Sequence, residues 1–126
     1  MEIESVKLVY FSPTGTTKMV VQGIAHGINP GTVELIDITR PDARKQPLLA
    51  SEDELFVVGV PVYMGRVPAL LNEWLNSIQA HNTPTVCVVV YGNRAYEDAL
   101  LELKNIVMKC GCIPIACAAY LGEHSF

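Results

Sequence analysis

A short run rich in hydroxyl side chains, Ser12-Pro13-Thr14-Gly15-Thr16-Thr17, follows the first apolar stretch of the sequence. It stands directly before a helical pattern, so it is expected at a helix N-terminus, where free backbone N–H groups and the helix dipole favour an anion. Gly15 allows close approach of the backbone to a ligand, and the four hydroxyls add hydrogen-bond donors. The loop therefore predicts a cradle for one phosphate group. The alternative is plain capping of the helix by Thr14, with the hydroxyls on the surface.

Two further loops combine aromatic, flexible and polar residues. The first reads Pro61-Val62-Tyr63-Met64-Gly65-Arg66-Val67-Pro68, and the second reads Tyr91-Gly92-Asn93-Arg94-Ala95-Tyr96. An aromatic ring or a thioether beside a glycine suits a flat aromatic ligand, although each aromatic taken alone is more often a packing residue. Together with residues 12–17, the two loops predict a site for a monophosphate attached to a planar ring.

Apolar runs alternate with helical periodicities along the chain, which is typical of βαβ units around a parallel sheet. Strands are expected at Val6–Phe11, Thr32–Ile38, Leu55–Val60, Thr85–Tyr91 and Ile113–Tyr120, and helices at Thr16–Ile28, from Pro68 through Ile78, and from about Tyr96 to Lys109. The charged residues of the second strand indicate a sheet edge, and Pro114 in the fifth strand indicates either an edge or the start of a strand. In such sheets ligands lie beyond the carboxyl ends of the strands, where all three loops fall.

The composition limits the class of protein. The chain has 126 residues, of which 50% are apolar and 17% charged, so one globular domain over residues 1–126 is expected. Nine basic and 13 acidic residues give a net charge of −4, which argues against nucleic acid as a partner. The apolar runs are shorter than the ~18 residues that span a bilayer, so we expect no membrane segment and a cytoplasmic protein.

The cysteines and histidines give little support to a metal site. Cys87, Cys110, Cys112 and Cys117 match neither a CxxC pair nor a cluster-binding run, so free buried thiols are expected. The three histidines are scattered, and His124 has no assigned role.

The three loops resemble those of flavodoxin-type FMN domains. Ser12-x-Thr14-Gly15-x-Thr17 matches the phosphate loop of that family, Met64-Gly65 matches the first ring loop, and Gly92 to Tyr96 matches the second. The resemblance extends over essentially the whole chain to the fifth strand. It implies an α/β, flavodoxin-like doubly wound sheet of five parallel strands in the order 2-1-3-4-5. The run from Gly122 to Phe126 is also similar to the flavin half of flavodoxin/ferredoxin fusion proteins, which implies a fused iron–sulfur domain or another redox protein as partner.

By matched position, the resemblance assigns roles to individual residues. Ser12, Thr14, Gly15, Thr16 and Thr17 would hold the FMN phosphate, Met64 would lie against the inner face of the ring, and Tyr96 would stack on the outer face. Tyr63 would edge the ring, and Gly65 would allow the preceding peptide to turn its carbonyl toward the reduced ring. The full set of expected cofactor-binding residues is Ser12, Thr14, Gly15, Thr16, Thr17, Pro61, Tyr63, Met64, Gly65, Arg66, Gly92, Asn93, Arg94 and Tyr96. Arg66 and Arg94 depart from the acidic surroundings usual in that family.

Three functions fit this resemblance and the fold. The first is electron transfer through FMN between a reductant and an iron–sulfur or enzyme partner, without catalysis by the chain alone. The second is an NAD(P)H-dependent FMN or quinone reductase, which would need a second pocket over the flavin. The third is a non-redox interaction domain on the same scaffold.

The resembling family has a helix after the fifth strand, and the expected elements of this chain include none. With right-handed crossovers, only the first helix lies on one face of the sheet, so a single helix must cover that whole face. The sequence thus predicts that apolar side chains of the third to fifth strands would face water in this chain alone. We expect either a homodimer or the next segment of a longer protein to cover them.

Overall fold

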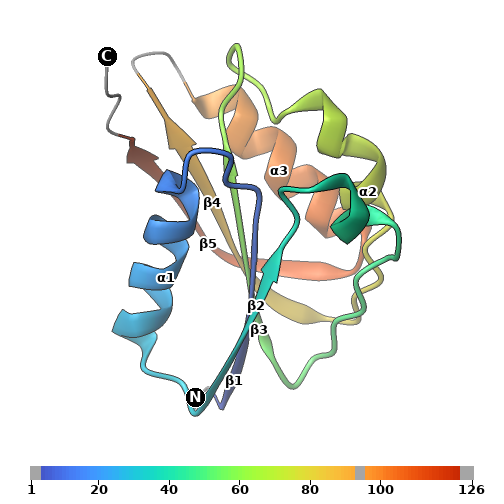
Figure 1. The fold of residues 1–126 in the computed structure, drawn as a ribbon. Helices are drawn as coiled ribbons and strands as arrows, with labels where there is room; N and C mark the ends of the chain where they lie inside the picture. Colours follow the sequence, from blue (N-terminus) through green and yellow to red (C-terminus); the bar gives the residue numbers. More distant parts are fainter. Residues whose placement is uncertain (1–3, 93–95, 123–126) are drawn as a thin grey trace.

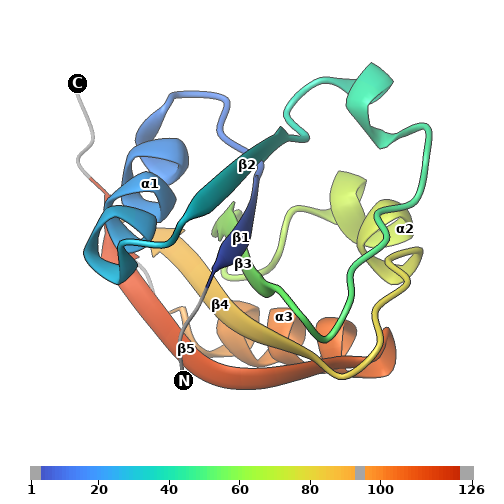
Figure 2. The same ribbon diagram turned by 90° about the horizontal axis from the view of Figure 1, so that it is seen from below.

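A computed structural model describes residues 4–92 and 96–122. It contains five strands: β1 (Ser5–Tyr10), β2 (Thr32–Asp37), β3 (Leu55–Pro61), β4 (Thr83–Tyr91) and β5 (Cys112–Leu121). The strands form one parallel sheet in the order β2-β1-β3-β4-β5, which confirms the predicted topology. Figures 1 and 2 show β2 and β5 at the two edges of the sheet.

The helices cover both faces of the sheet. They are α1 (Thr16–Ile28), α2 (Asn72–Asn76) and α3 (Glu97–Lys109), with 3₁₀ turns at Pro41–Arg44 and Ala69–Leu71. One core lies between the sheet and α2 and α3, and a second lies between the sheet and α1 (Figure 1). The expected apolar stripe of the second helix is confirmed, since Leu71, Trp74, Leu75 and Ile78 are all buried. The α-helical part is shorter than expected because the segment after Pro68 begins as a 3₁₀ turn.

Every strand differs from its expected bounds by one residue at one or both ends, except β4, which begins two residues earlier than expected. β4 begins at Thr83 rather than Thr85, because its first residues pair with Cys112 and Ile113 at the start of β5. The pairing then shifts by one residue, with Thr85 opposite Pro114 and Val86 opposite Ala116. A proline cannot donate to the ladder, so an edge strand with a bulge is where it is tolerated.

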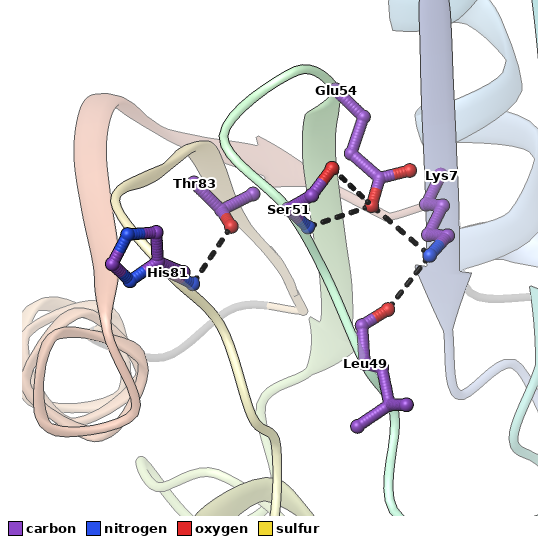
Figure 3. Close-up of polar contacts among 6 residues, drawn as sticks. All are labelled: Lys7, Leu49, Ser51, Glu54, His81 and Thr83. Carbon is purple, nitrogen blue, oxygen red and sulfur yellow. Dashed lines mark hydrogen bonds and ion pairs between the residues drawn. The ribbon is translucent and has the colours of Figure 1, made fainter.

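Lys7 is a charged residue in the middle of β1, next to the apolar core. Its Nζ donates to the backbone oxygen of Leu49 at 2.7 Å and lies 3.1 Å from Oε2 of Glu54, as Figure 3 shows. The same carboxylate oxygen accepts from the backbone N–H of Ser51 at 2.9 Å. Figure 3 also shows His81, whose backbone N–H donates to the hydroxyl oxygen of Thr83. The polar contacts of Lys7 thus join β1 to the segment that leads into β3, and they are structural.

The exposed apolar surface on the α1 face is smaller than the sequence predicted. β3 is buried along its length except for the half-buried Pro61, because α1 lies over β1, β3 and β4 at the centre of the sheet. Exposure falls instead on the edge strands, where Val33 and Leu35 of β2 and Ile113, Ile115 and Tyr120 of β5 are 40–57% exposed. The expectation that strand three would face water is therefore wrong.

Candidate functional site

The loop between β1 and α1 leaves hydrogen-bond donors free at the start of the helix. Gly15 is the N-cap, with a left-handed φ of +89°, and as a glycine it has no side chain that could cap this end. The hydroxyl of Ser12 accepts from the N–H of Lys18 at 3.0 Å, and the N–H of Met19 donates to Gly15. Among the described residues, no acceptor meets the N–H of Thr16 or Thr17. The alternative of capping by Thr14 is therefore not what the structure shows, and two donors remain for a ligand.

A cavity of ≈ 470 Å³ opens beside this loop, at the carboxyl ends of the strands. Its hydroxyl-bearing side comes from residues 13–17, and its aromatic and apolar side comes from the ends of β3 and β4 and the residues after them. The lining residues are Pro13, Thr14, Thr16, Thr17, Pro61, Val62, Tyr63, Val90, Tyr91, Gly92 and Gly122. A larger hollow of ≈ 610 Å³ lies between residues 44–47 and α2. The topology favours the first cavity because ligands of parallel sheets bind at the carboxyl ends of the strands.

Of the predicted site residues, Thr14, Thr16, Thr17, Pro61, Tyr63 and Gly92 line this cavity. Ser12 and Gly15 shape its loop through the hydrogen bond and the backbone conformation given above. Asn93 and Arg94 lie outside the described residues. Five lining residues, Pro13, Val62, Val90, Tyr91 and Gly122, were not among the predicted site residues, although Pro13, Val62 and Tyr91 belong to the loops that the sequence singled out. Gly122 depends on the pairing of β5 with β4, which no local motif signals; its N–H donates to Tyr91 at 2.7 Å.

The loop after β3 forms a tight turn at the mouth of the cavity. The N–H of Tyr63 donates to Arg66 at 2.8 Å, and the N–H of Arg66 donates back to Tyr63 at 3.0 Å. Met64 and Gly65 between them have φ values of +52° and +79°. Positive φ at both central residues is the pattern of a type I′ turn, and it is uncommon for a side chain such as methionine. The side chain of Met64 is fully exposed and, unlike the expectation from the resemblance, is not part of the cavity wall.

Arg66 is not among the lining residues of the cavity and instead holds this turn to α3. Its Nε and Nη2 donate to the two carboxylate oxygens of Glu102 at 3.0 and 2.8 Å. The N–H of Val67 donates to the same carboxylate at 2.9 Å. The hydrogen bonds from Arg66 hold the pKa of Glu102 below its ordinary value, against the opposing effect of burial. The predicted role of Arg66 beside a ring is thus replaced by a clamp on the loop.

Replacing Glu102 with glutamine is expected to loosen the turn at residues 63–66, because the ion pair and one of the two guanidinium hydrogen bonds are lost. The measurement is amide hydrogen exchange at Tyr63 and Arg66, which should become faster in the variant at neutral pH. Because the folded-state pKa of Glu102 is lowered, the carboxylate stabilises the folded state above its unfolded pKa, and this contribution is lost as the pH falls through the folded value.

The difference between wild type and Glu102→Gln should therefore shrink at acid pH. Glu34→Gln, at an exposed position of β2, is the matched control and should leave exchange in the turn unchanged. Equal exchange rates for Glu102→Gln and wild type at neutral pH would mean that the clamp does not hold the turn.

Aromatic rings pack in pairs around the cavity. Tyr91, in its wall, is stacked on Tyr96 with ring centroids 4.6 Å apart and an angle of 24° between the planes. Tyr63 meets Phe11 edge to face at 6.3 Å. Tyr96 was predicted to stack on the outer face of a ligand ring; in the structure it is stacked on Tyr91 and is not among the lining residues of the cavity. It thus orients the ring that borders the cavity.

The cysteines and the metal-ligating side chains are the other reactive groups in the described part of the chain. No group of three metal-ligating side chains occurs among residues 4–92 and 96–122. Cys87 and Cys112 are buried as expected, Cys110 is half-buried, and Cys117 is exposed, contrary to the expectation. Burial raises the pKa of the Cys87, Cys110 and Cys112 thiols, which makes them poor nucleophiles. In the same described ranges, no helix is long and apolar enough to cross a membrane.

No family model and no curated protein matches the sequence. Solved structures do match in fold. A flavodoxin from Streptococcus pneumoniae aligns with a TM-score of 0.68 at 15% identity, over 96% of this chain and 87% of its own. A flavodoxin from the domain Archaea aligns at 0.62 with 19% identity, over 93% and 84%. A flavodiiron core from Synechocystis aligns at 0.66 with 20% identity, over 95% of this chain but 31% of its own. The chain therefore has a flavodoxin-like fold.

Proposed function

We propose that this protein binds FMN in the cavity at the carboxyl ends of the strands and carries electrons between a reductant and a partner protein. The observation that carries the proposal is the placement of two free backbone N–H groups and several hydroxyls at one side of a cavity whose other side is aromatic. Solved flavodoxins that share the fold support the same cofactor.

The phosphate side of the cavity fits a dianion. The N–H groups of Thr16 and Thr17 are free in the described structure, and the hydroxyl-bearing residues Thr14, Thr16 and Thr17 line the same space. Nothing lies within 4 Å of the point where a Cβ on Gly15 would stand, so a ligand can approach the backbone there. These donors are neutral, and they act with the dipole of α1 on the negative charge.

The aromatic side fits a planar ring. Tyr91 is fixed by its stack on Tyr96, and Tyr63 is fixed by Phe11 and by the turn clamped to Glu102. Both tyrosines border the cavity, so either could stack on a flat ligand or contact its edge. Tyr63 is 42% exposed and Met64 fully so, which leaves this end of the cavity accessible to another protein.

Bound FMN would supply one- and two-electron redox chemistry that no side chain provides. The chain itself binds the phosphate, orients the ring and exposes one edge of the site to a partner. An iron–sulfur protein or domain, or a redox enzyme, is the class of partner that we propose. The cytoplasmic location expected from the sequence belongs to the same proposal.

Titration of the purified chain with FMN tests the proposal, followed by the absorbance and fluorescence of the flavin. We expect one FMN per chain. Riboflavin is the matched ligand, since it has the same ring and lacks the phosphate. It should bind roughly tenfold or more weakly, because hydrogen bonds to a charged group contribute about 1.5–3 kcal/mol each. Failure to bind FMN would refute the proposed cofactor, and equal binding of riboflavin would refute the phosphate assignment.

A second assay separates an electron carrier from a reductase. The FMN-loaded chain is mixed with NADPH or NADH and a quinone, with and without a separate flavoprotein reductase. We expect the nicotinamide to be oxidised only when the reductase is present. Steady turnover by the chain alone would contradict electron transfer as the function and favour a quinone reductase.

A further inference from the structure

β5 is an unusual strand to leave at the edge of a sheet. It has ten residues, Cys112 to Leu121, and none of them is charged. Edge strands are normally protected by charged side chains, by prolines or by short length, because their unpaired backbone groups can pair with another strand. β2 at the opposite edge follows this rule, with six residues that include Glu34 and Asp37. In β5, Pro114 and its bulge protect only the first half.

Within the part of the chain that the structure describes, the second half of β5 offers a regular row of unpaired backbone groups. The N–H of Gly122 donates to Tyr91, so the backbone groups of Gly122 point toward β4. The pairing of β5 with β4 is regular from Ala116 onward, so the backbone groups of Ala116, Ala118 and Tyr120 also point toward β4. Since successive residues of a strand face opposite neighbours, the N–H and C=O groups of Cys117, Ala119 and Leu121 point outward. Figure 2 shows β5 as the outermost strand on this side of the sheet.

We propose that a second copy of this chain pairs with β5 across a two-fold axis, with the two strands antiparallel and Ala119 opposite Ala119 of the partner subunit. In this register, every outward N–H and C=O group of Cys117, Ala119 and Leu121 has a hydrogen-bond partner on the other subunit. Ala119 would exchange two hydrogen bonds with its counterpart, and Cys117 would exchange two with the residue equivalent to Leu121, on each side of the axis. The pairing closes after two chains, because a two-fold contact joins the same surface of both subunits.

The side chains of the segment are complementary to themselves in this register. Tyr120, 40% exposed, comes opposite the small Ala118, and Leu121, 67% exposed, comes opposite Cys117. The central pair is two alanines, which leaves room for the strands to approach. Because the strand has no charged residue, two copies meet without like-charge repulsion. A partner recognised by charge would find no complementary group on this segment, so the observations favour a second copy over a charged peptide.

The arrangement would join two sheets into one of ten strands. Because the two subunits run in opposite directions, their cavities would lie at opposite ends of the joined sheet, and each would keep its own access to solvent. The dimer is therefore compatible with one cofactor per chain and does not depend on the proposed function.

Sedimentation velocity of the purified chain over a range of concentrations tests the proposal. We expect a reversible dimer. Ala119→Lys should raise the dissociation constant of the dimer by about tenfold or more, because two lysines would face each other at the centre of the contact. Val33→Lys is the matched control, since Val33 is an exposed apolar residue of the other edge strand. It should leave the dimer unchanged. Circular dichroism and thermal unfolding show whether each variant is folded.

Disulfide cross-linking tests the register without depending on the lysine variant. In a Cys117→Ser background, Ala119→Cys oxidised with diamide should give a covalent dimer, because facing residues of a hydrogen-bonded antiparallel pair lie about 5.5 Å apart at Cα, within reach of a disulfide. Val33→Cys in the same background should give no covalent dimer. A chain that stays monomeric at all concentrations, a dimer that Ala119→Lys does not weaken, or equal cross-linking of both variants would overturn the proposal.

Discussion

Valine in place of both Thr14 and Thr17 is expected to weaken FMN binding by roughly 1.5–3 kcal/mol for each hydroxyl that no longer donates to the phosphate, or roughly ten- to hundredfold in Kd per hydroxyl. Both residues line the cavity beside the free N–H groups of α1. Thr17 is buried, and valine keeps its branched shape, so the change removes the hydroxyl with little loss of packing. Titration of the double variant with FMN measures the effect.

Two controls make this result specific to the phosphate. Riboflavin affinity should change little in the double variant, since riboflavin has no phosphate to lose. Thr32→Val, at an exposed threonine of β2, should bind FMN as the wild type does. Because the donors are neutral, wild-type affinity should fall only slightly as salt is raised. An unchanged FMN titration in the double variant, or an equal loss for riboflavin, would refute the assignment of this loop.

The element types and their approximate boundaries could be predicted because local sequence determines them, whereas the sheet order was expected from the resemblance to flavodoxin-type domains. Each buried strand is a nearly continuous apolar run, and α1 spans the predicted residues Thr16–Ile28. Gly111 ends α3 as expected, with a φ of +100° that few other residues tolerate. The bulge in β5 could be predicted only as a consequence of Pro114, and its position depends on how β5 pairs with β4.

The candidate cavity contains the predicted residues where one loop supplies them, and it departs from the prediction where several elements meet. The hydroxyl loop was recognisable because its donors are consecutive in sequence. Arg66 was misplaced because its partner, Glu102, lies on α3, 36 residues away, and no local pattern signals that ion pair. Tyr96 was misplaced for the same reason, since its orientation depends on the ring of Tyr91. A residue's type predicts which chemistry it offers, but its direction depends on packing across the fold.

Gly59 lies in β3 directly under α1, and alanine at this position is expected to destabilise the protein by about 1–3 kcal/mol through overpacking. A Cβ there would stand 2.5 Å from Cγ1 of Val21 and 3.1 Å from Cγ2 of Thr17. Both contacts belong to α1, so the helix must move away from the sheet. Because Thr17 also lines the cavity, FMN affinity should fall together with the free energy of unfolding.

A second substitution separates this steric effect from a general loss of stability. Val21→Ala removes the methyl group nearest to the new Cβ, so Gly59→Ala with Val21→Ala should be more stable than the sum of the two single effects predicts. Gly23→Ala is the matched control: Gly23 is in the same helix, nothing lies within 4 Å of its Cβ position, and it should gain up to about 1 kcal/mol. Urea unfolding and FMN titration measure both quantities. Strictly additive effects of the two substitutions would mean that α1 does not approach β3 as closely as the fold requires, and that Gly59 does not set the position of the phosphate loop.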